Sequence, residues 1–179
     1  ILIDNGSNDQ SRRVLLEWKN QNSKFVEYLR VEENASVGTP YFWEQIKQFN
    51  PEWIIFPGDD DILVFDIFDE WKLAVSNNPN LNAFACSAVL INSDSEPIGT
   101  DRSPAILKST SKPSQLAKGI HESPFLWPGL IFKFDSVITP VPFSRYVFDW
   151  WVGLQLISDG DTCTTNKIGV RYRVHGQQE

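Results

Sequence analysis

The chain has 179 residues, a formal net charge of −7 and two cysteines. We assign residues 1–179 to a single domain, because this length can bury one sizeable core. The acidic balance, without any Lys/Arg-rich run, argues against nucleic acid as a partner. Cys86 and Cys163 are too few for a disulfide framework and lack metal-ligand spacing, so a reducing, cytoplasmic compartment is expected.

The first predicted elements alternate between strand and helix. Residues 1–3 predict a short strand that ends on Asp4 and Asn5, before a Gly-Ser turn. Helically spaced apolar residues predict a helix over 10–20, and alternation predicts a strand over 24–31.

A Thr-Pro pair then marks the start of a second helix. Thr39 is a capping residue, and Pro40 is favoured in a first helical turn.

Residues 53–61, Trp-Ile-Ile-Phe-Pro-Gly-Asp-Asp-Asp, organise the rest of the chain. The apolar run predicts a buried strand, and the Pro-Gly pair ends it. In an open α/β sheet, ligands lie just beyond the carboxyl ends of the strands. The neighbouring carboxylates of Asp59, Asp60 and Asp61 resist joint ionisation unless a cation neutralises them. Since Mg²⁺ and Mn²⁺ take carboxylate and phosphate oxygens, we interpret this stretch as a metal–diphosphate site.

Two other interpretations of these aspartates compete with a metal site. Aspartates commonly cap helices, and Asp66 precedes the next predicted helix. A calcium-binding EF-hand loop is disfavoured, because its sixth position requires a glycine that this sequence lacks.

The second half of the chain is mixed. We expect a helix from Asp66 to the break at 77–79, then a strand over 82–92 and a surface loop over 93–113. We expect His121 to lie in a loop and Trp127 in a turn that leads into a strand. The chain should end with a helix over 148–158 and a strand over 168–174. The last strand has one apolar face and one cationic face. Together the elements predict an α/β sandwich with a mixed, largely parallel central sheet.

Three short motifs follow one another along the chain. Residues 3–9 are Ile-Asp-Asn-Gly-Ser-Asn-Asp, and residues 58–61 are Gly-Asp-Asp-Asp. Residues 148–151, Phe-Asp-Trp-Trp, precede residues 172–176, Tyr-Arg-Val-His-Gly. In this order the motifs resemble a family 2 glycosyltransferase over most of the chain. The resemblance implies a GT-A-like three-layer sandwich that lacks its first strand and helix here.

The resemblance also implies a reaction and a set of site residues. A sugar would pass, with inversion, from a nucleotide-sugar donor to a glycan or lipid-linked acceptor, with Mn²⁺ or Mg²⁺ as cofactor. Asp149 matches the family's catalytic base. The remaining roles are donor binding by Asp4, Asn5, Asp59, Asp60 and Arg173, metal binding by Asp61 and His175, and acceptor binding by Trp127, Trp150 and Trp151.

Two alternatives compete with sugar transfer. A degenerate domain would bind nucleotide or glycan without turnover. A sugar nucleotidyltransferase shares a related α/β sheet and also uses metal-bound phosphates. If the chain is a glycosyltransferase, we expect it in the cytoplasm at the inner face of the membrane, with any peripheral attachment supplied by residues outside this chain.

Overall fold

The structure, a computed structural model, describes residues 1–31, 39–99, 102–104, 111–137 and 148–174. These residues fall into two compact units. The first holds residues 1–51 and Phe148, and the second holds the other described residues. Whether 1–179 is one domain in the evolutionary sense stays a prediction.

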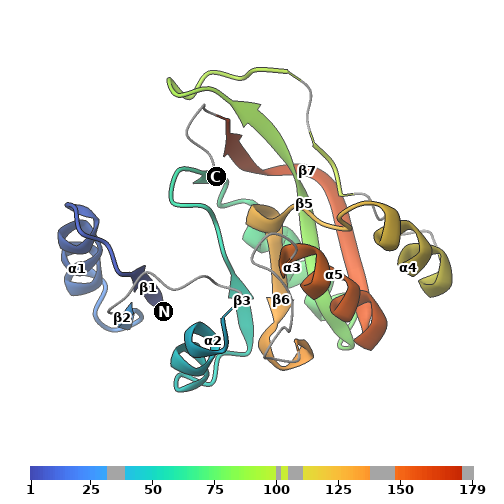
Figure 1. The fold of residues 1–179 in the computed structure, drawn as a ribbon, viewed down its shortest axis with the longest axis horizontal. Coiled ribbons are helices and arrows are strands. Elements are labelled where there is room, and N and C mark those ends of the chain that lie inside the picture. Colours follow the sequence, from blue (N-terminus) through green and yellow to red (C-terminus); the bar gives the residue numbers. More distant parts are fainter. Residues whose placement is uncertain (32–38, 100–101, 105–110, 138–147, 175–179) are drawn as a thin grey trace. The chain divides into compact units, whose positions relative to one another are not determined.

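The first unit contains a β-α-β segment and a separate helix (Figure 1). Strands β1 (Leu2–Asn5) and β2 (Tyr28–Val31) pair in parallel, and α1 (Ser11–Gln21) connects them. A helical crossover of this kind is the usual way to join parallel neighbours. Helix α2 (Pro40–Lys47) begins after Thr39, as predicted, and its buried side chains are Phe42, Trp43 and Ile46.

The second unit is built on a five-stranded sheet of order β3-β6-β5-β7-β4. The strands are β3 (Trp53–Ile55), β4 (Ile62–Leu63), β5 (Leu81–Ile91), β6 (Leu130–Lys133) and β7 (Asp161–Arg173). β5 and β7 are parallel, whereas the β3–β6, β5–β6 and β4–β7 pairs are antiparallel. The sheet is mixed, as predicted, but in this unit antiparallel neighbours outnumber parallel ones.

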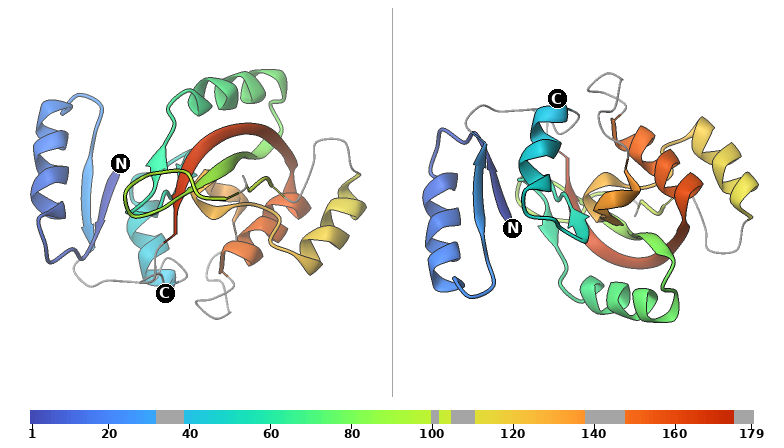
Figure 2. Two further views of the ribbon diagram at one scale, coloured as in Figure 1. Left: turned by 90° about the horizontal axis from the view of Figure 1, so that it is seen from above. Right: turned by 90° about the horizontal axis from the view of Figure 1, so that it is seen from below.

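Helices cover both faces of this sheet. They are α3 (Ile67–Asn77), α4 (Lys112–His121), α5 (Phe148–Asp159) and the short 3₁₀ turns η1 (Trp127–Gly129) and η2 (Phe134–Ser136). Figure 2 shows β7 as a strongly curved strand, with α3 against its convex side and α5 on its concave side. Among the described residues, no helix combines the length and apolar character that a membrane crossing requires.

The core of the second unit follows from its central strand. Residues 81–88 of β5 are all buried, because the strand has neighbours on both edges and helices on both faces. A strand covered in this way is expected to be a near-continuous apolar run. Phe84, Phe132 and Leu156 are among the largest fully buried side chains around it.

Several predicted boundaries were wrong. β2 is shorter than the predicted strand over 24–31, and β7 begins seven residues before the predicted strand over 168–174. His121 ends α4 and does not lie in a loop. Helix α4 was missed; only Gln115 and Gly119 of its residues are buried, and its apolar Ile120 is exposed.

The described part of the predicted loop over 93–113 is made of turns and coil up to residue 104, as predicted, but its last two residues begin α4. The chain turns back after β5 and runs antiparallel beside it, with bridges between Ile91 and Pro97 and between Ala88 and Arg102. Residues 100–101 and 105–110 of the predicted loop lie outside the described residues.

Candidate functional site

We define the acidic turn as residues 58–61. Between β3 and this turn, the chain packs in an aromatic stack. Phe56 stacks on Trp127 with ring centroids 5.5 Å apart and an interplanar angle of 9°. Phe132 packs at a tilt against both rings. The Asp61 N–H then donates to Gly58 O at 3.3 Å and closes the turn. The turn therefore begins on a packed aromatic wall at the carboxyl end of β3.

Two of the three carboxylates of the acidic turn lie together. A Cβ atom at Gly58 would be 2.6 Å from Asp61 Oδ2 and 2.9 Å from Asp60 Oδ1. Both carboxylates thus occupy the space beside Gly58 that any side chain would fill. Asp59, in contrast, is exposed. The structure brings together Asp60 and Asp61 as a carboxylate pair.

The carboxylate pair is electrostatically strained. Burial raises the pKa of Asp61, and the negative charge of Asp60 raises it further. A hydrogen bond from the Arg173 N–H to Asp61 Oδ1, 2.9 Å long, acts in the opposite direction. A bound cation would favour the ionised form of both carboxylates.

The donor set fits a hard divalent cation. Among the described residues, no three His, Cys, Asp or Glu side chains gather as ligands. Mg²⁺ is commonly held by one or two carboxylates and completes its shell with water and substrate phosphates. Asp60 and Asp61 could hold such an ion. His175, the other predicted metal ligand, lies outside the described residues.

Arg173, predicted to bind the donor, is turned toward protein groups. Its guanidinium donates to Asp60 O at 2.8 Å, to Asn92 O at 2.7 Å and to Ser93 O at 2.9 Å. It also donates to Ser95 Oγ at 3.0 Å. These bonds tie the end of β7 to the acidic turn and to the turn after β5. Direct contact between Arg173 and a donor stays a prediction.

Asp149, the predicted base, lies in the first turn of α5, where the helix dipole favours a negative charge. It shares an electrostatic neighbour with the acidic turn. Burial raises the pKa of Tyr172, and the charges of Asp61, Asp60 and Asp149 raise it further. Tyr172 is therefore within electrostatic reach of both the carboxylate pair and the predicted base.

Arg102 is a cation of this region that the sequence did not single out. Its guanidinium lies 5.7 Å from the centroid of the Tyr172 ring, and its charge lowers the pKa of that phenol. The antiparallel bridge to Ala88 holds it there. No local sequence signal marked it, because the bridge joins Arg102 to a strand fourteen residues earlier.

The predicted acceptor-binding tryptophans all make contacts within the fold. One face of Trp127 is covered by Phe56. The Trp150 indole N–H donates to Gly119 O and so fastens α5 to the last turn of α4. Trp151 is half-buried in α5. Their role in acceptor binding stays a prediction.

In the first unit, Asp4 is the centre of a hydrogen-bond network. Its side chain is 0% exposed. Oδ2 accepts from Tyr28 Oη at 2.7 Å and from Arg30 Nη1 at 2.6 Å, while Oδ1 accepts from Ser7 N at 2.8 Å. Burial alone would raise the pKa of Asp4, but these hydrogen bonds outweigh it and lower the value to about 2. Asn5, the next residue of β1, is half-buried.

The Asp4 network shows what the sequence analysis missed. Tyr28 and Arg30 stand two apart on β2, so both reach the same face and meet Asp4 on the neighbouring strand. The spacing of Tyr28 and Arg30 in the sequence was the signal that could have predicted this network. Contacts of Asp4 and Asn5 with a nucleoside stay predictions.

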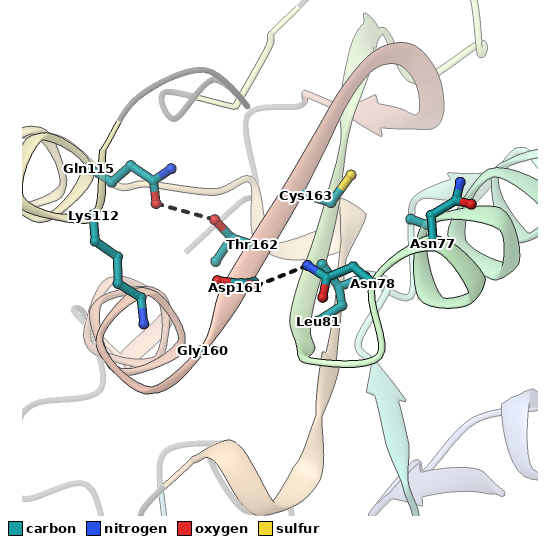
Figure 3. A pocket seen from close by; sticks show the side chains of 10 residues that line it. Asn77, Asn78, Leu81, Lys112, Gln115, Gly160, Asp161, Thr162 and Cys163 are labelled. Atoms are coloured by element: carbon teal, nitrogen blue, oxygen red, sulfur yellow. Dashed lines mark hydrogen bonds between the residues drawn. The ribbon is translucent and has the colours of Figure 1, made fainter.

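A cavity of about 440 Å³ lies at the opposite end of the sheet from the acidic turn, where β5 and β7 begin (Figure 3). Its polar side chains bind one another. Asn78 Nδ2 donates to Asp161 Oδ2 at 3.1 Å, and Thr162 Oγ1 donates to Gln115 Oε1 at 3.4 Å. None of the predicted site residues lines it.

No family model matches the chain, and no curated protein sequence matches it. Among solved structures, it is similar to S. aureus TarS 1–349 in complex with UDP-GlcNAc, with a TM-score of 0.63 and 11% identity over 98% of this chain and 49% of that one. A second structure of S. aureus TarS gives a TM-score of 0.61 and 13% identity, over 96% and 30% of the two chains. The chain thus spans less than half the length of these proteins. The likeness confirms the predicted glycosyltransferase-like α/β sandwich and shows the fold alone.

Proposed function

We propose that this chain belongs to a metal-dependent, inverting glycosyltransferase that uses a nucleotide-sugar donor. The observation that carries the proposal is the carboxylate pair of Asp60 and Asp61 at the carboxyl end of β3, in the same unit as Asp149. Tyr172 responds to the charge of all three carboxylates. The position agrees with the rule that ligands of α/β sheets lie beyond strand carboxyl ends.

The three carboxylates have two tasks in this proposal. Asp60 and Asp61 would hold Mn²⁺ or Mg²⁺, which when bound supplies positive charge to the donor diphosphate as its bond to the sugar breaks. Asp149 would accept the proton of the attacking acceptor hydroxyl. A single displacement of this kind inverts the configuration at the anomeric carbon. The acceptor itself would be a glycan or a lipid-linked glycan.

The chemistry of the ligand in a structural neighbour supports the donor class. UDP-GlcNAc, bound in the S. aureus TarS complex, is a nucleotide sugar. A diphosphate is anionic and this chain has a formal net charge of −7, so the diphosphate would need a bridging cation or a local cluster of arginines to bind. UDP is therefore the first nucleotide to test.

The first test is thermal unfolding of the full-length protein with UDP, dTDP or GDP, each with and without Mn²⁺. A ligand that binds only the folded state raises the free energy of unfolding by about 2.7 kcal/mol when its concentration is one hundred times its dissociation constant. We expect one of the three nucleotides to raise the unfolding temperature, and to do so only when Mn²⁺ is present. No rise with any nucleotide at saturating concentration would contradict the proposal.

A second test separates transfer from mere binding. Asp149→Asn should abolish sugar transfer and leave the Mn²⁺-dependent thermal rise intact, because the proposed base contacts the acceptor and not the diphosphate. If the wild-type protein binds donor but transfers to no acceptor, the degenerate binding domain becomes the better interpretation. Unchanged transfer by Asp149→Asn would contradict the assigned base.

A further inference from the structure

Arg173 joins two turns that are far apart in the sequence. Its backbone N–H donates to Asp61 Oδ1, and Nε donates to Asp60 O in the same acidic turn. Its Nη atoms donate to Asn92 O, Ser93 O and Ser95 Oγ in the turn that follows β5. One residue therefore connects the acidic turn, which carries the proposed cation ligands, to a separate surface turn.

The turn that follows β5, residues 92–96, is held in a specific conformation. Asn92 Oδ1 accepts the N–H groups of Asp94 and Glu96, each at 2.9 Å. Ser95 has φ 67°, in the left-handed region that non-glycine residues seldom adopt. Such a backbone persists only where surrounding contacts fix it, and the bond from Arg173 to Ser95 Oγ is one such contact.

We propose that Arg173 is a positioning residue that couples cation binding at Asp60 and Asp61 to the order of the 92–96 turn. The proposal rests on the cation site of the proposed function and adds the regulation of that site. The turn leads into the chain segment that carries Arg102 to the Tyr172 ring. A change in the order of the 92–96 turn on cation binding would thus reach the region of Tyr172 and the predicted base.

The geometry explains why arginine is needed here. The guanidinium is a planar group with donors in several fixed directions, so one side chain can bond both turns at once. Lysine keeps the charge but places its donors on a single atom. Groups that orient metal ligands without touching the metal typically change metal affinity 10- to 100-fold when they are replaced.

The first test is Mn²⁺ binding measured by electron paramagnetic resonance on the full-length protein, without donor or acceptor. We expect Arg173→Lys to weaken Mn²⁺ binding by about 10- to 100-fold. The matched control is Arg171→Lys, on the same strand, where the arginine is exposed. The control should bind Mn²⁺ as the wild type does. Equal Mn²⁺ affinity in Arg173→Lys and Arg171→Lys would overturn the proposal.

A second test does not depend on the folding of a variant. Hydrogen exchange of the wild-type protein, with and without saturating Mn²⁺, reports the 92–96 turn through the Ser95 N–H, which donates to Asn92 O, and the Glu96 N–H. We expect Mn²⁺ to slow exchange in this turn as well as in the acidic turn. Slowing confined to the acidic turn would overturn the coupling.

The two proposals fail in distinguishable ways. Mn²⁺ binding and hydrogen exchange need no sugar, so a protein that binds Mn²⁺ but transfers nothing contradicts only the proposed transfer. A protein that transfers sugar while Arg173→Lys retains full Mn²⁺ affinity contradicts only the role of Arg173. A wild-type protein that binds no Mn²⁺ contradicts the shared cation site.

Discussion

Asp61 lies where a carboxylate is unfavourable for folding. It is half-buried, it lies beside Asp60, and its pKa is raised by both effects. A carboxyl group whose folded pKa lies above its unfolded value destabilises the protein once both states are ionised. That destabilisation is present above the folded pKa and disappears as the pH falls below the usual value of 3.8. Carboxyl groups with perturbed pKa values cluster at functional sites.

Replacing Asp61 by asparagine should therefore stabilise the metal-free protein. Asn Oδ1 can still accept the N–H of Arg173, while the buried negative charge is removed. We expect a gain of about 0.5–1 kcal/mol at pH 7, low in the usual range because the group is half-exposed. The measurement is urea unfolding at several pH values, together with the loss of Mn²⁺ binding.

Asp59→Asn, in the same turn but exposed, is the control and should leave stability nearly unchanged. The gain from Asp61→Asn should shrink as the pH approaches 3.8. A loss of stability at pH 7 would show that the Asp61 carboxylate is not strained.

At the scale of elements, the success of the sequence analysis depended on burial. Helix α3 was predicted because its apolar residues, among them Ile67, Trp71 and Val75, recur at helical spacing and pack on the core, and strand β5 because it is a largely apolar run that is buried over 81–88. Helix α4 presents few buried residues, and the first half of β7 is rich in Thr and polar groups, so neither produced a pattern. Local periodicity reports a buried face and nothing else.

Long-range contacts could not be predicted from the sequence for a different reason. The acidic turn was identified from neighbouring aspartates, but the partners of Arg173 lie 113 residues away at Asp60 and 81 residues away at Asn92. Pairing over such distances is decided by sheet order, which a single sequence does not reveal. The sequence could therefore propose the acidic turn as a metal–diphosphate site and Arg173 as a donor-binding residue, whereas the contacts between Arg173 and the acidic turn could not be predicted.

The packing of β7 against its neighbours gives a prediction at this scale. A Cβ atom at Gly169 would lie 2.4 Å from Cys86 Sγ on β5 and 2.6 Å from Ile67 Cγ1 on α3. Gly169→Ala must push these elements apart, and we expect a loss of about 1–3 kcal/mol in the free energy of unfolding. The measurement is urea unfolding.

Asn166→Ala, an exposed position on the same strand, is the matched control and should change stability by no more than about 0.5 kcal/mol. Equal stability of the two variants would mean that α3 does not pack on β7 as closely as the structure has it.

At the scale of the whole chain, the two units contain acidic groups that respond to pH in opposite ways. Asp61 of the second unit has a raised pKa, whereas Asp4 of the first unit has a pKa lowered to about 2. Ionisation of Asp4 stabilises the first unit, whereas ionisation of Asp61 destabilises the second unit. The acid sensitivity of the two units should therefore differ.

We expect acid to open the first unit before the second. The folded pKa of Asp4 lies below its usual value of 3.8, so its stabilisation is fully present above pH 3.8 and is lost as the pH falls through about 2. At roughly 1.4 kcal/mol for each unit of pKa shift, this stabilisation amounts to about 2.5 kcal/mol. The measurement is hydrogen exchange from pH 5 to pH 2, corrected for intrinsic rates. The reporters are the Leu2 N–H, which donates to Glu27 O, and the amides of β5.

Asp4→Asn should remove this difference, because the amide is uncharged and its single acceptor oxygen replaces only one of the two carboxylate oxygens, of which one bonds Ser7 and the other bonds Tyr28 and Arg30. At pH 7 the variant should show faster exchange in β1 and β2 and unchanged exchange in β5. If the wild-type β1 and β5 amides lose protection together as the pH falls, then Asp4 does not govern the acid stability of the first unit.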